Sequence, residues 1–281
     1  MVAECNKLKC LFDVVDWSAV SFVRMQSLLN LEKLEIRNCE RLQEVFKLEG
    51  LLTGEGEQQN LLLSRLKEML LYNLLELRCI WKGLTKLINL NCLTYLKVIN
   101  CRKLRYLFTP TLASSLQNLN CLEIHSCDEL EYLIAKDEEN RILSDGDLQP
   151  LHFPQLCKVI VNECNKLKFL FPITIVDSLL GLSYLEVQGA SQLVEVFAHE
   201  DEGDAAIQKD VTLPKLNYIA LDLLPSLVNF CPMNYHSILP NLRGLIVKSC
   251  PNMTTSFTCT PDKTVHINGE VTQSSFLLLF L

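Results

Sequence analysis

Thirteen cysteines are the residues of this sequence with the greatest potential for chemistry. Closely spaced thiolates, as in C-x-x-C pairs, bind zinc, and an even set in a secreted chain predicts disulfides. Here the number is odd and no C-x-x-C pair occurs. The N-terminus, MVAECNKLKCLF, also lacks the apolar segment of a secretory signal. We therefore predict free thiols in a reduced intracellular compartment and no metal site.

The histidines and carboxylates form no recognisable catalytic motif. The histidines occur singly, without an H-E-x-x-H pair, and no G-x-S-x-G elbow of a hydrolase is present. Adjacent carboxylates such as Glu138 and Glu139 lie in acidic stretches, where solvated charge is the simpler explanation. We predict that the chain is not an enzyme. The histidines are His125, His152, His199, His236 and His266.

Bulk composition favours a folded protein over a disordered or membrane-spanning one. Of the 281 residues, 49% are hydrophobic and 21% are charged, which suits a large buried core. The net charge of −7 argues against a nucleic acid partner, because binding phosphates needs a clustered positive surface. The apolar run 276–281 is far shorter than the ~20 residues of a membrane span.

An internal repeat explains where most apolar residues stand. The template L-x-x-L-x-x-L-x-L-x-x-C-x-x-L recurs eight times, with conservative exchanges. Its x-L-x-L-x segment alternates as a half-buried strand does, and stacked copies of such a repeat share one core. Its third apolar position is held in turn by Leu34, Met69, Leu96, Leu122, Val159, Leu185, Ile219 and Leu245.

The spacing of the copies predicts where the repeats are interrupted. Successive copies are 35, 27, 26, 37, 26, 34 and 26 residues apart, whereas ordinary leucine-rich repeats run ~20–29 residues. The three long intervals therefore hold insertions, at 47–60, 136–150 and 199–212. Their net charges are −2, −3 and −4, so the acidity of the chain lies in them and the repeat body is about neutral.

These observations predict an α/β solenoid. We expect a leucine-rich-repeat horseshoe with a concave parallel β-sheet and a convex side of short helices and irregular turns. The solenoid would cover residues 1–257, with a partial first repeat at 1–12 and eight repeats from about residue 28. Residues 258–281 would form a C-terminal tail or ragged cap. Because the first repeat is cut through its strand, we expect a piece of a longer protein or a truncated gene product.

Six cysteines share one position of the template, directly after the predicted strand. A thiol there is a small buried filler beneath the turn, and intervals of 26 or more residues between these cysteines offer no cluster of metal ligands. We therefore predict a structural role for them. They are Cys5, Cys39, Cys101, Cys127, Cys164 and Cys250.

The exposed strand positions are the candidate partner-binding surface. Tyrosines and aliphatic residues amid mixed charge are what protein interfaces favour, and we predict Tyr95, Tyr184 and Tyr218 as energetic anchors. The alternative is that β-forming side chains stand there for strand pairing alone. The predicted concave face comprises Lys33, Glu35, Arg37, Glu68, Leu70, Tyr72, Tyr95, Lys97, Ile99, Glu123, His125, Lys158, Ile160, Asn162, Tyr184, Glu186, Gln188, Tyr218, Ala220, Asp222, Ile246 and Lys248.

A second candidate surface is basic. Cations recur just past the strand in several repeats, and a stripe of them would suit an acidic domain face of the same parent protein. The alternative is that they pair with neighbouring glutamates and acidic loops. The possible intramolecular stripe comprises Lys7, Lys9, Arg102, Lys103, Arg105, Lys166 and Lys168.

Three segments carry a resemblance to a known family. LEKLEIRNCERLQEVF at 31–46, LKVINCRKLRYLFTPTLASSLQNLNCLEIHSCDELEYL at 96–133 and LPNLRGLIVKSCPNM at 239–253 resemble the repeats of plant coiled-coil NB-LRR disease resistance proteins. The resemblance covers residues 1–257. It implies an intracellular immune receptor, at work in the cytoplasm, the nucleus or at the inner face of the plasma membrane.

The resemblance also implies the partners. The repeats would sense a pathogen effector or a host protein that the effector alters, and would restrain the nucleotide-binding domain of the parent protein. No G-x-x-x-x-G-K-[ST] loop or N-terminal coiled-coil heptad is present, so we expect no cofactor in this chain, and ADP or ATP only in the parent's nucleotide-binding domain. No nucleic acid partner and no membrane span are expected.

Two other functions are compatible with the repeats. The substrate-recruiting region of a ubiquitin ligase would also be a repeat solenoid, but the F-box helical motif is absent. An inactive truncated receptor fragment would account for the incomplete first repeat. An extracellular receptor would show paired cap cysteines and several glycosylation sequons, and here only Asn252-Met253-Thr254 fits a sequon.

Overall fold

The computed structural model describes residues 1–5, 7–13, 28–48, 61–83, 87–135, 151–199, 209–268 and 276–280. The acidic stretches 49–60, 136–150 and 200–208 lie outside these residues. The strands that precede them in the chain are β4 (Glu44–Leu48), β10 (Tyr132–Ile134) and β14 (Phe197–Ala198).

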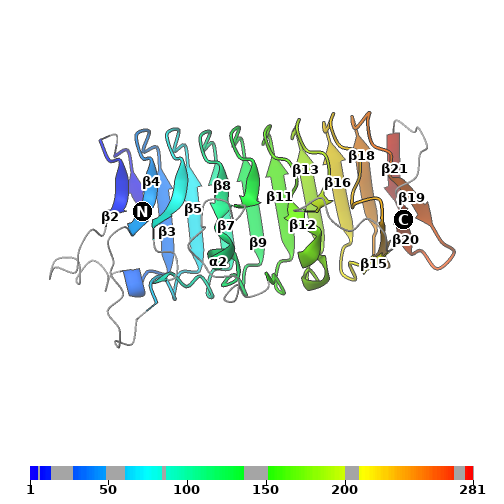
Figure 1. Cartoon of the computed structure of the whole chain (residues 1–281), viewed down its shortest axis with the longest axis horizontal. Helices are drawn as coiled ribbons and strands as arrows, with labels where there is room; N and C mark the ends of the chain where they lie inside the picture. The colour runs from blue at the N-terminus through cyan, green and yellow to red at the C-terminus, as the bar shows by residue number, and fades with distance from the viewer. Residues whose placement is uncertain are drawn as a thin grey trace.

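One long sheet, which we call the front sheet, runs the length of the molecule (Figure 1). Nine of its ten strands are parallel, and the last pairs antiparallel with its neighbour. This confirms the predicted leucine-rich-repeat solenoid. In spatial order its strands are β1 (Val2–Ala3), β3 (Lys33–Arg37), β5 (Glu68–Tyr72), β7 (Tyr95–Ile99), β9 (Cys121–His125), β11 (Lys158–Asn162), β13 (Tyr184–Gln188), β16 (Tyr218–Asp222), β18 (Gly244–Lys248) and β21 (Phe276–Phe280).

The register of the front sheet is the one that the repeat alignment predicts. Leu34 pairs with Met69, and Met69 pairs in turn with Leu96. The same alignment continues to Ile219 and Leu245. Every residue of this row is buried, with at most 4% of its surface exposed. A slip by one residue would turn these side chains to solvent, so burial of the row fixes the register.

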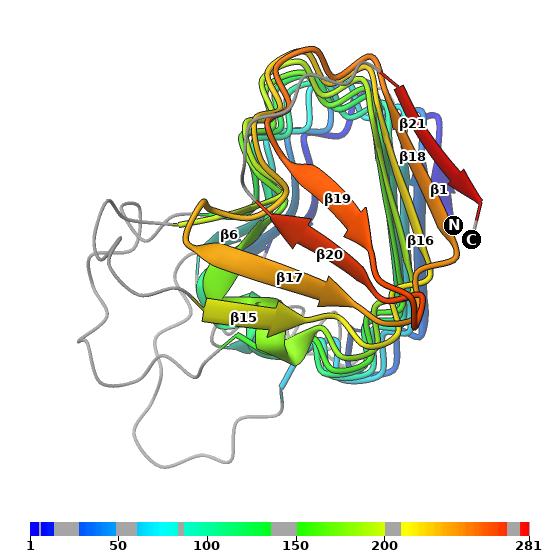
Figure 2. The ribbon, with the colours of Figure 1, turned by 90° about the vertical axis from the view of Figure 1, so that its right-hand side faces the viewer.

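The opposite side of the coil differs from the prediction, because it carries short strands where short helices and irregular turns were expected. Figure 2 looks along the coil and shows these strands facing the front sheet. Segments such as EVFKL and YLF are β-branched and aromatic and pair with the same segment of the next coil. The rings of Phe12, Phe46 and Trp81 stack there, with centroids 5.0 and 4.9 Å apart.

The short strands form four small sheets among the described residues. Two helical segments, α2 (Pro110–Ala113) and η3 (Ile173–Ser178), lie on the same side. The sheets are β2 (Cys10–Asp13) with β4 and β6 (Cys79–Gly83); β8 (Tyr106–Phe108) with β10; β12 (Phe171–Pro172) with β14; and β15 (Lys209–Thr212), β17 (Tyr235–Leu239), β20 (Val265–Asn268) and β19 (Ser256–Cys259).

Three strands, one of them in the front sheet, lie in stretches that were predicted to be irregular. Strand β15 belongs to the stretch 199–212, predicted as an insertion, and it pairs in parallel with β17 because Val211 packs into the core. Strands β20 and β21 belong to the predicted tail 258–281. Both pair antiparallel with the last coil and cover its edge. No helix in the described part of the chain is long and apolar enough to span a membrane.

Four of the six template cysteines lie buried under the turn after their front strand, whereas the prediction is wrong for Cys5, which is exposed, and only partly met by the half-buried Cys250. Cys39, Cys101, Cys127 and Cys164 are completely buried. The Sγ of Cys39 donates to the carbonyl oxygen of Arg37 at 3.4 Å, and the other three repeat this contact two residues back. Burial raises the pKa of Cys101 to about 12. These thiols are therefore neutral fillers of the core.

The residue directly after each parallel front strand has a left-handed backbone. Its φ lies between 53° and 66° in all nine coils, and its N–H extends the ladder, as Asn38 does by donating to Tyr72 O at 3.0 Å. Glycine and asparagine tolerate this conformation best, and Gly189 and three asparagines occupy it. Among the other five residues at this position, Leu223, with a φ of 55°, is the only aliphatic one.

We predict that Leu223→Asn raises the free energy of unfolding by about 1 kcal/mol, because asparagine relieves the strain of a left-handed leucine. The measurement is chemical denaturation followed by circular dichroism. Leu180→Asn is the matched control, since the exposed fractions are 51% for Leu223 and 54% for Leu180, and Leu180 has no positive φ. If both substitutions changed the free energy of unfolding equally, the left-handed backbone at Leu223 would not be the cause.

Candidate protein-binding face

The outward side chains of the front sheet form three columns, because the first, third and fifth residues of each strand are in register. The first column is Lys33, Glu68, Tyr95, Cys121, Lys158, Tyr184, Tyr218 and Gly244. The middle column is Glu35, Leu70, Lys97, Glu123, Ile160, Glu186, Ala220 and Ile246. The third column is Arg37, Tyr72, Ile99, His125, Asn162, Gln188, Asp222 and Lys248.

The structure places every predicted partner-binding residue in these columns. All are exposed or half-buried except Leu70, which is 7% exposed between Glu35 and Lys97. Sequence reasoning left out Cys121 and Gly244, the first-column residues of β9 and β18. Their strand position was readable from the repeat, but neither residue type drew attention as a contact residue.

Glu123 is the centre of a polar cluster in the middle of the face. Its carboxylate lies 2.8 Å from Lys97 Nζ, 3.5 Å from Lys158 Nζ and 3.2 Å from the hydroxyl of Tyr95, which donates to it. Burial by itself would raise the pKa of Glu123, but the hydrogen bond and charge of Lys97, with help from Tyr95 and Lys158, hold that pKa below its ordinary value. The cluster therefore keeps a carboxylate ionised on a largely covered part of the sheet.

We predict that Glu123→Gln lowers the free energy of unfolding by about 1–2 kcal/mol at pH 7, through loss of charge-assisted hydrogen bonds. The folded pKa is depressed, so this stability is present above the unfolded value near 4.5 and is lost as the pH falls through the folded pKa. Denaturation at pH 7 and at pH 3 checks this. The difference between the two proteins should shrink at pH 3, and a difference that is independent of pH would refute the assignment.

Tyr184 and Tyr218 make an aromatic pair on neighbouring strands. Their ring centroids are 4.7 Å apart and the planes differ by 9°. The Tyr184 hydroxyl donates to Glu186 at 2.6 Å, and burial followed by this contact raises the pKa of Tyr184. A Cβ on Gly244 would lie 2.7 Å from Cδ2 of Tyr218. Because Gly244 has no side chain, the ring of Tyr218 can lie directly against β18.

Tyr95 stands apart from this pair. Strands β9 and β11 separate β7 from β13, so at ~4.8 Å per strand the two tyrosine sites are roughly 14 Å apart. At the other end of the sheet, the guanidinium of Arg37 lies 4.3 Å above the ring of Tyr72 and also pairs with Glu35. The three predicted anchors thus form two separate sites on one face.

The predicted basic stripe is largely neutralised. Glutamate and lysine alternate at the same place in successive coils, so that Lys103 Nζ lies 2.6 Å from Glu76 and Lys166 Nζ lies 2.6 Å from Glu129. The carboxylate of Glu131 forms two ion pairs: Oε1 lies 3.2 Å from Nε of Arg105, and Oε2 lies 3.5 Å from Nζ of Lys168. Arg102 hydrogen-bonds Asn100, and Lys7 and Lys9 make no ion pair within the described residues. The structure thus favours pairing with glutamates for most of the stripe.

The sequence also missed a pair of histidines. His236 and His266, which appeared isolated, face each other with Nε2 and Nδ1 3.0 Å apart, and Asp210 Oδ1 lies 3.1 Å from Nδ1 of His236. They meet because β20 pairs antiparallel with β17. No local sequence pattern predicts this pairing. Over the described ranges, no group of three or more His, Cys, Asp or Glu side chains could hold a metal ion.

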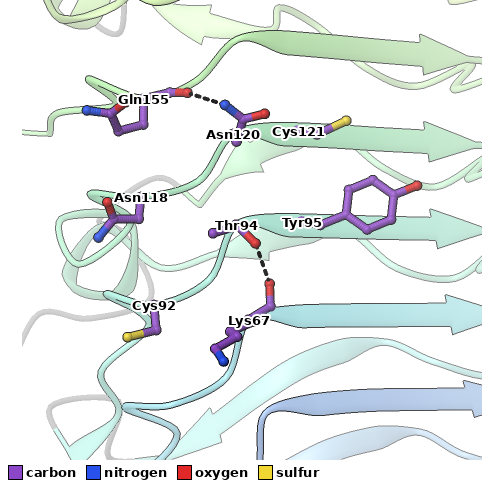
Figure 3. A pocket seen from close by; sticks show the side chains of 8 residues that line it. All are labelled: Lys67, Cys92, Thr94, Tyr95, Asn118, Asn120, Cys121 and Gln155. Carbon is purple, nitrogen blue, oxygen red and sulfur yellow. Dashed lines mark hydrogen bonds between the residues drawn. The ribbon is translucent and has the colours of Figure 1, made fainter.

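A shallow depression of about 660 Å³ borders the face at the start of strands β7 and β9 (Figure 3). Three of its side chains donate to backbone carbonyl oxygens: Asn120 Nδ2 to Gln155 O at 3.1 Å, Thr94 Oγ1 to Lys67 O at 3.0 Å and Asn118 Nδ2 to Asn91 O at 2.7 Å. Tyr95 and Cys121 belong both to the depression and to the first column. It therefore extends the outward columns. The thiol of Cys121 donates to Glu123 at 3.7 Å, and burial, followed by the charge of Glu123, raises the pKa of Cys121 to about 11, so the thiol is protonated rather than activated.

The family of leucine-rich repeats described as plant disease resistance protein RPS2-like matches residues 1–128 and again residues 129–266. The chain belongs to this family. The RPS2-like repeats thus extend over nearly all the coils described above, and repeats of this kind are protein-interaction modules. No curated protein and no solved structure matches the chain.

Proposed function

We propose that these RPS2-like repeats are the protein-recognition module of an intracellular plant immune receptor. The front sheet senses a pathogen effector or a host protein that the effector modifies, and the module restrains a nucleotide-switch domain until then. ADP or ATP binds in that domain of the parent protein. The repeats themselves supply binding surface and no catalytic group.

The observation that carries this proposal is the composition of the front face. Parallel strands hold the outward side chains in fixed columns, and Tyr95, Tyr184 and Tyr218 stand there amid charged neighbours. Aromatic anchors surrounded by polar groups are the usual composition of a binding hot spot. Because the supporting strands are rigid, these side chains lose little freedom when a partner binds. The exposed Lys7 and Lys9 flank is the proposed contact for an acidic face of the nucleotide-switch domain.

Proximity labelling in plant leaf tissue tests the proposal. The full chain, fused to a labelling enzyme, would be compared with the variant Tyr95→Ala, Tyr184→Ala and Tyr218→Ala, with and without pathogen challenge. We expect a set of proteins that the wild type labels and the triple variant does not. The control is Lys103→Ala with Lys166→Ala, which changes the basic stripe and leaves the outward columns of the front sheet as they are. Labelling that is the same for all three proteins would refute recognition by the front sheet.

A further inference from the structure

The carboxylates of the front sheet fall into two groups. Glu35, Glu68 and Glu123 each form an ion pair with a lysine or arginine of the same sheet. Glu186 and Asp222, on the neighbouring strands β13 and β16, form none within the described residues. Glu186 and Asp222 are therefore the two carboxylates of the outward columns that no cation of the described residues pairs with.

The side chains around Glu186 and Asp222 leave room between these carboxylates. Ala220 is the middle-column residue of β16, beside Glu186 in register and two residues before Asp222. Its methyl group is the shortest side chain of the middle column. Across a sheet, diagonal neighbours such as Glu186 and Asp222 are ~7–8 Å apart. A single long side chain lying over Ala220 can therefore reach both carboxylates.

Two acceptor atoms on the strands that flank β13, one in Asn162 on β11 and one in Asp222 on β16, have no donor in the described part of the chain. Asn162 Oδ1 and Asp222 Oδ1 are shielded from solvent and accept no hydrogen bond from the described residues. The amide of Asn162 is held by donating to Glu186 at 3.2 Å, so its oxygen remains the free atom. Lys248 is the register neighbour of Asp222, but its exposed side chain makes no ion pair with it. Unsatisfied acceptors beside unpaired carboxylates favour a ligand that brings several donors.

The stacked pair Tyr184 and Tyr218 lies next to the two carboxylates. Tyr218 precedes Ala220 by two residues on the same strand, and Tyr184 holds Glu186 through its hydroxyl. Their stacked rings provide an apolar edge next to the two carboxylates. An apolar stem that ends in a cation matches both parts of this surface.

We propose that this corner of the front sheet binds an arginine side chain of a partner protein. The planar guanidinium offers five donors in a fork that fits carboxylates, is weakly hydrated and stacks flat on aromatic rings. A lysine ammonium has three donors around a single point charge and is strongly hydrated. Its stem lies over Ala220 beside Tyr218, and its donors face Glu186 and Asp222. This inference rests on the proposed function, because it specifies the partner chemistry of the same face.

Selection of random twelve-residue peptides displayed on phage tests the arginine site with defined probes. The immobilised full chain would be compared with Glu186→Gln plus Asp222→Asn, and with the control Glu35→Gln plus Glu68→Gln. The control removes the same charge from ion-paired positions of the same sheet. We expect arginine to be enriched on the wild type and on the control, and the enrichment to be lost on the first variant.

The strongest selected peptide would then be synthesised with arginine or with its neutral analogue citrulline. We expect citrulline, and separately the Glu186 and Asp222 substitutions, to raise Kd by tenfold or more, with little further loss when they are combined. Absence of arginine enrichment, or a Kd unchanged by Glu186→Gln plus Asp222→Asn, would overturn the proposal. Peptides that depend on Tyr184 but not on the two carboxylates would refute the arginine site and leave recognition by the front sheet standing.

Discussion

Replacing Phe197 with alanine is expected to lower the free energy of unfolding by about 3–5 kcal/mol. Its side chain is completely buried on β14. Its ring centroid lies 6.4 Å from that of Phe171 and 5.6 Å from that of Phe230, so it joins three successive coils. Removing it loses the transfer energy of the ring and leaves a cavity that regular coils cannot collapse to fill.

Urea denaturation followed by circular dichroism measures this loss. Val194→Ala is the control, because Val194 belongs to the same coil and is 47% exposed, and it should change stability by less than about 0.5 kcal/mol. Each coil contacts only its neighbours, so the damage should also appear as earlier local opening of β12 and β14 in hydrogen exchange. Equal losses for the two variants would contradict a continuous core at this point.

The second large effect concerns binding. For a partner captured by the front sheet, Tyr184→Ala is expected to raise Kd about 30-fold, which corresponds to about 2 kcal/mol for a hot-spot tyrosine. Tyr218→Ala should have a similar effect, because each ring holds the other in place. For the same reason, the double variant should lose less than the sum of the two single losses.

Isothermal titration calorimetry with the purified partner measures these affinities. Tyr235→Ala is the control, since Tyr235 is a half-buried tyrosine on β17, on the opposite side of the coil. Its Kd should match that of the wild type. An unchanged Kd for both Tyr184→Ala and Tyr218→Ala would mean that these residues stand on the face for strand pairing alone.

The sequence by itself determined the coil and its register. Rows such as Leu34, Met69 and Leu96 could be aligned across insertions of any length, because only stacked apolar positions bury a core. The two-residue alternation then assigned each outward position, including the tyrosines. Local periodicity and burial contain this information, and both are present in the order of residues along the chain.

Only the tertiary structure decided how the coils interact laterally. The strands opposite the front sheet, the left-handed residue after each front strand, and the meeting of His236 with His266 depend on stacking. So does the contrast between the ion-paired Glu123 and the unpaired Glu186. The contacts of Glu123 with lysines and with Tyr95, and that of His236 with His266, join residues 26–35 positions apart in the chain. Side-chain reach and rotamer choice at such contacts follow from packing in three dimensions, which no local pattern of residue types encodes.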